Sequence, residues 1–130
     1  MKIELVPIGV VKTEVEKVPR HWTISDAEGT LVIEEQYTEG VKDIHAGQRI
    51  VVLFYFHQSP QFTEDFLVQV PPQGPGQMGV FSICSPVRPN PLGMSVVEVL
   101  GIEGSIIHIK GLDMIDGTPV LDIKPYRERD

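Results

Sequence analysis

The chain has 130 residues, of which 42% are hydrophobic and 22% charged, and its formal net charge is −7. This length is enough for one domain with a sizeable core, and this composition excludes a disordered chain. The single cysteine, Cys84, excludes an internal disulfide, and we find no run long enough for a membrane span and no signal-peptide pattern. We expect a single cytoplasmic domain.

The negative net charge argues against a surface that attracts nucleic acid everywhere, because neutralising phosphates dominates such affinity. Many acidic residues fall in the first half of the chain. Four basic residues lie in or just after two motifs of the second half: Arg88, Lys124, Arg127 and Arg129. They could form a local basic patch on an acidic protein.

The first half of the chain alternates short apolar runs with charged or glycine-containing segments. We expect strands over residues 3–13 and 31–37, and another over residues 66–70. Ser25 followed by Glu28 resembles a capping box, so we expect a helix start of one turn there, and a second helical turn over residues 41–44.

The segment from Arg49 to His57, RIVVLFYFH, is the strongest predicted strand. Its successive apolar residues indicate a central strand that is buried on both faces. His57 and Gln58 stand where this strand ends. A histidine at such a place is more often a structural group than a catalytic one.

The stretch GVFSICSPVRPNPLGMS, residues 79–95, begins as an apolar strand over residues 80–83 and then contains three prolines between residues 86 and 91. Prolines fix φ and remove backbone donors, so neither a helix nor a ladder forms there. Such a stiff loop would hold Ser85, Arg88 and Asn90 in set positions. The alternative is a turn that only reverses the chain.

The last third of the chain reads as strands joined by tight turns. Residues 95–102 and 105–110 are rich in β-branched residues and flank Glu103 and Gly104, which predicts a hairpin. A turn over residues 116–119 precedes a strand over 120–124. Many short strands with almost no helical periodicity predict an all-β fold, mainly an antiparallel β-barrel with a few short helical turns.

SPVRPNPLGMS, residues 85–95, followed by DMIDGTPVLDIKPY, residues 113–126, resembles the signature of the TsaA/TrmO-like family. That family comprises S-adenosylmethionine-dependent tRNA methyltransferases built on a β-barrel, and the resemblance runs from about residue 8 to residue 126. It implies S-adenosylmethionine as cofactor, methylation on N6 of threonylcarbamoyl-adenosine beside the tRNA anticodon, and a homodimer. Longer relatives have an additional C-terminal domain, which we do not expect over residues 1–130.

The resemblance implies cofactor contacts in two places. A Pro-Arg-Gln segment of the family corresponds to Pro19, Arg20 and His21, and a His-Gln pair corresponds to His57 and Gln58. The adenine of the cofactor also needs an apolar wall, and its ribose suits a carboxylate. The residues that we expect to supply these contacts are Met94, Asp113, Met114, Ile115 and Asp116.

The acceptor nitrogen belongs to a urea-like group and is a poor nucleophile while protonated, so a positioned base would help. Asp113, Asp116 and His57 are the candidates, and the sequence does not choose among them. Unpaired anticodon bases are recognised by stacking and edge contacts. The residues that we expect to contact tRNA are Ser85, Arg88, Asn90, Lys124 and Tyr126.

Cys84 stands where the family commonly has arginine, whose charge-assisted contacts a thiol cannot replace. Two other functions stay open: a barrel that binds the cofactor with a different acceptor or none, and a non-enzymatic RNA-binding accessory protein.

Catalysis by a Cys84 nucleophile is disfavoured because we expect its thiol in an apolar strand. A Ser85–His57–Asp116 triad lacks a nucleophile elbow. The four histidines have no metal-ligand spacing, so we expect no metal.

Overall fold

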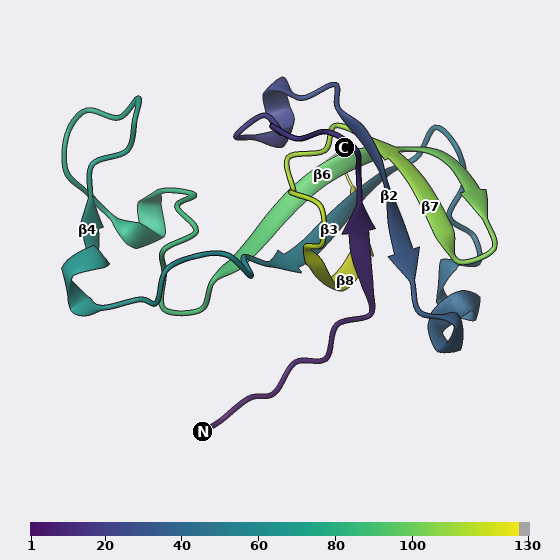
Figure 1. The fold of residues 1–130 in the computed structure, drawn as a ribbon, viewed down its shortest axis with the longest axis horizontal. Coiled ribbons are helices and arrows are strands. Elements are labelled where there is room, and N and C mark those ends of the chain that lie inside the picture. Colours follow the sequence, from purple (N-terminus) through teal and green to yellow (C-terminus); the bar gives the residue numbers. More distant parts are fainter. Residues whose placement is uncertain (128–130) are drawn as a thin grey trace.

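The computed structural model describes residues 1–127, and Arg129 of the predicted basic patch lies outside them. Six antiparallel strands form a closed barrel in the order β1-β2-β7-β6-β3-β8 (Figure 1). Their bounds are β1 Gly9–Lys12, β2 Glu28–Ile33, β3 Arg49–Tyr55, β6 Leu92–Glu103, β7 Ile106–Lys110 and β8 Pro119–Pro125. The predicted all-β antiparallel barrel is confirmed.

Side chains on the inner face of each strand fill the barrel. On β3, Ile50, Val52 and Phe54 are buried, whereas Val51 and Leu53 between them are half-buried. The prediction that this strand is buried on both faces is therefore wrong. In a closed barrel only one face of a strand points to the interior.

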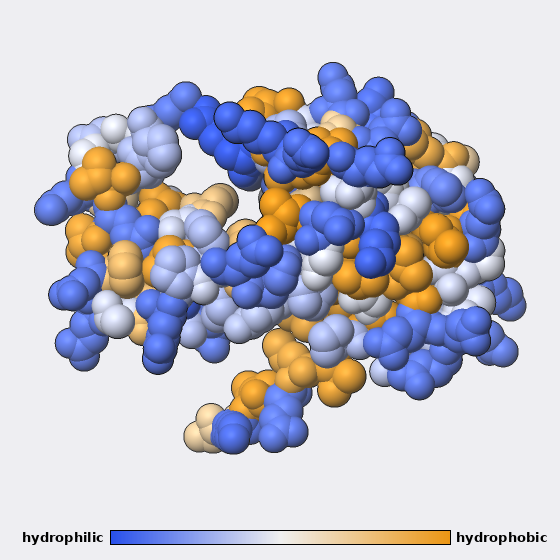
Figure 2. All heavy atoms as spheres, viewed as in Figure 1, coloured by the Kyte–Doolittle hydropathy of each residue, from blue (hydrophilic) through white to orange (hydrophobic). Residues whose placement is uncertain are grey.

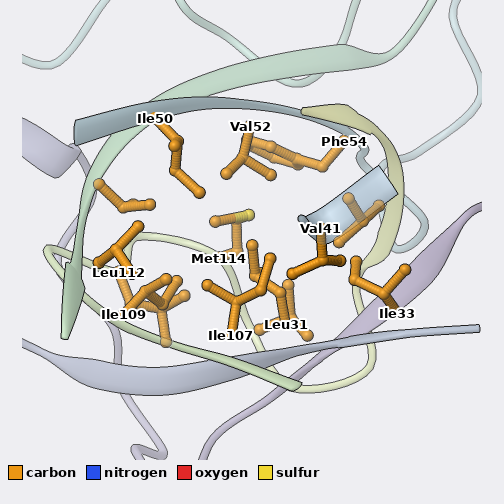
Figure 3. Close-up of a cluster of buried hydrophobic side chains, with 14 residues drawn as sticks. Leu31, Ile33, Val41, Ile50, Val52, Phe54, Ile107, Ile109, Leu112 and Met114 are labelled. Atoms are coloured by element: carbon orange, nitrogen blue, oxygen red, sulfur yellow. The ribbon is translucent and has the colours of Figure 1, made fainter. Parts of the chain in front are cut away.

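The segment between β7 and β8 adds two side chains to this core. Leu112 and Met114 are 0% and 2% exposed, and Met114 lies among Leu31, Val41 and Ile107 (Figure 3). The N–H groups of Gly111 and Leu112 both donate to the carbonyl of Ala27, at 2.9 and 3.0 Å. These contacts fix the segment on both sides of Asp113.

Residues 56–91, between β3 and β6, form a lobe beside the barrel, drawn in teal in Figure 1. It contains η3 Glu64–Phe66, β4 Val68–Gln69, β5 Met78–Gly79 and η4 Val80–Ser82, with β4 and β5 paired in a sheet of their own. The strand predicted over residues 66–70 is two residues long, and that predicted over 80–83 is a 3₁₀ turn. A two-stranded pair buries too little apolar surface to extend, and Val68, Val70 and Phe81 are exposed.

Two predictions for the N-terminal 28 residues are wrong. The strand expected over residues 3–13 is only β1, and residues 1–7 are exposed. The helix start expected at residues 25–28 is absent, because the Ser25 hydroxyl donates to the carbonyl of Leu112 and accepts from the Ala27 N–H, while Glu28 begins β2. A 3₁₀ turn, η1 Trp22–Ile24, precedes it instead.

The strand expected over residues 31–37 is β2, which ends at Ile33. Residues 41–44 do form a turn, in which the N–H of Ile44 donates to the carbonyl of Val41 at 3.0 Å, but the turn is not helical because Asp43 has a φ of 76°. A 3₁₀ helix, η2 Glu35–Val41, precedes it. The hairpin turn at Gly104 and the turn at Gly117 are confirmed, with φ values of 60° and 86° that suit glycine. Over residues 1–127, no helix has the length and apolar character to cross a membrane.

Leu112→Ala should lower the free energy of unfolding by about 2–5 kcal/mol, because it opens a cavity in the barrel and loosens the segment that carries Asp113. Leu100→Ala, on the outside of β6, is the matched control and should lower the free energy of unfolding by only about 0.5 kcal/mol. Urea denaturation measures both, and equal losses would contradict the core position of Leu112.

Candidate functional site

A groove lies at one end of the barrel, against the lobe, and consists of three adjoining hollows. We call them the outer, middle and inner hollows, of about 600, 450 and 260 Å³. Figure 2 shows a notch between lobe and barrel with hydrophobic residues on its margins. The outer and middle hollows share Arg20, His21, Ile83, Cys84 and Pro86, and the middle and inner hollows share Phe54, Phe56, Pro86 and Asp113.

Two aromatic rings form the barrel-side wall of this groove. Phe54 and Phe56 stand edge to face, with ring centroids 5.1 Å apart. Gly93 on β6 pairs with Phe54, and a Cβ at Gly93 would overlap the Phe54 ring and lie 2.8 Å from Cζ of Phe56. The absence of a side chain at Gly93 therefore makes room for the wall.

Asp113 lies where the middle and inner hollows meet, and its carboxylate is held from β6. The hydroxyl of Ser95, which is 0% exposed, donates to Oδ1 of Asp113 at 2.5 Å. Burial raises the pKa of Asp113, while the Ser95 hydrogen bond, the nearby His21 and a backbone hydrogen bond from Trp22 each lower it in part. The net direction is upward, which favours a carboxyl that can exchange a proton.

The segment before β2 covers the other side of the groove. Nδ1 of His21 accepts from the N–H of Thr23 at 3.3 Å and so caps the 3₁₀ turn η1. The imidazole also lies 5.3 Å from the Trp22 ring, centroid to centroid. Arg20, the preceding residue, is exposed at the margin of the outer and middle hollows.

The proline-containing loop is held by side chains as well as by its prolines. Nη1 of Arg88 donates to the carbonyls of Ile83 and Ser85, both at 3.0 Å, so the guanidinium spans the loop. From the lobe, Nε2 of Gln69 donates to the carbonyl of Val87 at 2.8 Å. Cys84 is exposed and outside any strand, so the expectation of a thiol in an apolar strand is wrong.

Most of the predicted cofactor residues line the groove. Met94 lines the middle hollow with Arg20, His21 and Asp113, and Pro19 precedes Arg20 in the chain. The inner hollow is lined by His57, Gln58, Met114 and Ile115. Of the predicted tRNA residues, Arg88 lines the middle hollow and Ser85 the outer one.

Two predicted site residues, Asp116 and Asn90, do not line the groove. Oδ1 of Asp116 accepts from the N–H of Thr13 at 3.0 Å, and this residue lines a separate hollow of about 1020 Å³. Asn90 lines an apolar hollow beside the N-terminal segment. Because Ser85, His57 and Asp116 line three different hollows, no catalytic triad is assembled from them.

Lys124 and Tyr126 lie at the far end of β8, which pairs with the start of β3. Nζ of Lys124 is 2.9 Å from Oδ2 of Asp122, and the Arg49 guanidinium lies 4.5 Å from the Tyr126 ring centroid. The groove begins at Phe54 of β3. Lys124 pairs with Val51 and Tyr126 lies beside Arg49, three and five residues away, or about 10 and 16 Å along the strand. Lys124 and Tyr126 therefore lie outside the groove.

Ser95, Phe54, Phe56, Trp22 and Gly93 are the site residues that the sequence reasoning did not name. A serine that interrupts an apolar strand was the available signal for Ser95, since a buried hydroxyl needs a partner. Within residues 1–127, no three His, Cys, Asp or Glu side chains are grouped so that they could hold a metal ion.

Residues 10–129 match the family model of the tRNA-methyltransferase O N-terminal domain. An S-adenosyl-L-methionine-binding protein of Archaeoglobus fulgidus is 39% identical over 94% of this chain and 88% of its own length. The human tRNA (adenine(37)-N6)-methyltransferase is 45% identical over 58% of this chain. A crystal structure of TrmO from Pseudomonas aeruginosa matches 98% of this chain with a TM-score of 0.76 and 33% identity.

The chain spans only part of several of these proteins. The match covers 55% of the Pseudomonas TrmO chain and 17% of the human protein. A second Archaeoglobus fulgidus relative, a probable S-adenosyl-L-methionine-binding protein, is 37% identical and is covered over 34% of its length.

Asp113→Asn should gain stability relative to the wild type as the pH rises from about 4 to about 7. The folded chain holds the Asp113 proton to higher pH than the unfolded chain does, so the wild-type free energy of unfolding falls as the pH rises through the interval between the two pKa values. Asparagine cannot ionise and has no such loss.

Urea denaturation at several pH values measures this difference. Asp122→Asn, which removes a carboxylate paired with Lys124 on β8, is the control and should show no such gain. A stability difference for Asp113→Asn that does not change with pH would contradict the effect of burial on Asp113.

Proposed function

The chain belongs to the family of the tRNA-methyltransferase O N-terminal domain, and we propose that it is an S-adenosylmethionine-dependent tRNA methyltransferase. The acceptor that we propose is N6 of threonylcarbamoyl-adenosine beside the anticodon. The observation that carries the proposal is the groove, to which both signature motifs contribute: Arg88 and Met94 from the first, Asp113 and Met114 from the second.

The groove offers each part of the cofactor a suitable partner. Phe56, half-buried and supported edge to face by the buried Phe54, offers apolar aromatic surface to the adenine. Arg20 suits the carboxylate of the methionine moiety, and Gln58 its polar atoms. When bound, the cofactor supplies an electrophilic methyl group. The contribution of the chain is then to orient it and the acceptor, which accounts for much of the acceleration in such displacements.

The outer hollow is the place that we propose for the acceptor nucleoside, with its N6 directed into the middle hollow, which Asp113 lines. It opens from the middle hollow, past Arg20 and His21, toward the proline-rich loop of the lobe. Apolar and amide side chains there suit an unpaired base, which proteins recognise by stacking and by contacts to its edge. Lys124 and Tyr126, outside the groove, are proposed to meet a more distant part of the same tRNA.

Cys84 gives one specific reason to keep a second candidate function. It is exposed on both the outer and the middle hollow, where the family commonly has an arginine, and the chain as a whole carries a net charge of −7. Both features weaken phosphate binding. The second candidate is a barrel that binds the cofactor and serves a different acceptor or none.

We also propose that two copies associate through the N-terminal segment. Ile3, Leu5 and Val6 are 73%, 58% and 67% exposed, and Figures 1 and 2 show this segment projecting from the barrel with hydrophobic residues along it. With Tyr55, Leu92 and Leu121 it borders an apolar hollow of about 630 Å³. Contiguous apolar surface of this kind marks an interaction site, and the occupant that we propose is a second copy.

Calorimetric titration with S-adenosylmethionine should show saturable binding of one molecule per chain. Gly93→Ala should weaken it by about tenfold or more, because the new methyl group displaces the Phe54 and Phe56 rings. Gly101→Ala, on the same strand with open space around it, is the matched control and should bind as the wild type does.

Transfer of labelled methyl from the cofactor to tRNA carrying threonylcarbamoyl-adenosine then tests the acceptor. Binding without transfer to any tRNA would favour the second candidate function. No binding at about millimolar cofactor, with or without tRNA, would overturn the proposed function.

Leu5→Asp should convert the protein to a monomer in sedimentation velocity, because it places a charge in the proposed contact between copies. Val68→Asp, a similarly exposed apolar residue on β4 in the lobe, should leave the dimer intact. A monomeric wild type at about 50 μM would contradict the proposed dimer.

A further inference from the structure

Three groups stood as candidates for the base, and their positions differ. Asp116 lines another hollow and its carboxylate already accepts the N–H of Thr13. His57 lines only the inner hollow and is exposed. Asp113 lines both the middle and the inner hollow, beside the aromatic wall. It is the carboxylate among them that reaches the centre of the groove.

Ser95 holds the Asp113 carboxylate from the barrel side. It is fully buried on β6, with Val96 and Val97 following it and Val52 as its partner on β3. Thr118, the other buried polar residue in the described chain, satisfies its hydroxyl locally on the carbonyl of Ile115. Ser95 reaches across to Asp113 instead, 18 residues away. A buried hydroxyl in this place fixes one carboxylate oxygen and therefore the orientation of the group.

We infer that Asp113 is the proton acceptor for N6 of the substrate adenosine and that Ser95 is its positioning residue. The inference rests on the proposed function. N6 forms a bond to the methyl carbon, the carbon–sulfur bond breaks with its electron pair left on sulfur, and the N6 proton passes to the carboxylate of Asp113. The sulfonium becomes a neutral thioether and the carboxylate a neutral acid, so the charges balance.

The surroundings of Asp113 suit this task. Burial raises the pKa of Asp113, so the carboxylate is a stronger base than one in water, while the Ser95 hydrogen bond offsets part of this rise and orients the carboxylate. The charged or titratable groups that line the same hollows are Arg20, His21, Cys84 and Arg88 in the middle one and His57 in the inner one. The pH profile is therefore measured for His21→Gln and His57→Gln variants as well as for the wild type.

The test measures cofactor affinity and single-turnover methyl transfer to threonylcarbamoyl-tRNA with the full chain. Asp113→Asn should keep cofactor affinity within about threefold and lower the transfer rate by about 10²–10⁴-fold. Ser95→Ala should lower the rate less and move the rising limb of the pH–rate profile to higher pH, because the hydrogen bond that favours the charged carboxylate is lost. Ser95→Thr keeps the hydroxyl and should return the rising limb of the pH–rate profile to its wild-type position.

Asp43→Asn is the matched control, since it removes an exposed aspartate after η2, outside the groove, where asparagine suits the φ of 76°, and it should leave the rate unchanged. A near wild-type rate for Asp113→Asn, or a larger loss in Asp116→Asn, would overturn the inference. Loss of cofactor affinity in Asp113→Asn would make Asp113 a cofactor ligand and would also overturn it. A wild type that neither binds the cofactor nor methylates tRNA marks failure of the proposed function instead.

Discussion

The burial of Leu112 and Met114 on either side of Asp113 is the constraint on which the groove depends. A carboxylate at the edge of an apolar core loses hydration, and a mobile segment would turn it toward water. Here two core side chains and two backbone hydrogen bonds to Ala27 prevent that movement. The free energy of core packing thus holds Asp113 in an environment that raises its pKa.

The pairing of β6 explains why this segment can lie where it does. From Glu98 onward β6 pairs with β7, whereas Leu92–Val97 pair only with β3 among the described strands. Residues 111–113 and η1 lie along the part of β6 that does not pair with β7. There Ser95 donates to Asp113. The groove is therefore a consequence of unequal strand lengths: β6 has twelve residues and β7 five.

The proline-containing loop and the lobe complete the site from the other side. Arg88 uses its guanidinium within the loop, on the carbonyls of Ile83 and Ser85, so its part in the groove is at least partly structural. Side-chain hydrogen bonds from Gln69 and Ser59 hold the same loop against the rest of the lobe. These bonds suit a groove whose walls keep their shape before any ligand arrives, which reduces the ordering cost of binding.

The sequence by itself determined the barrel, its hairpin at Gly104 and the place of the two motifs that line the groove, because strand periodicity, turn glycines and prolines act locally. It misjudged the 80–83 segment and the helix start at Ser25, where contacts distant in sequence override local preference. It also could not separate Asp113 from Asp116. The two differ by three positions in the chain, yet only tertiary structure decides that one meets Ser95 in the groove and the other Thr13 outside it, since burial and partners depend on packing.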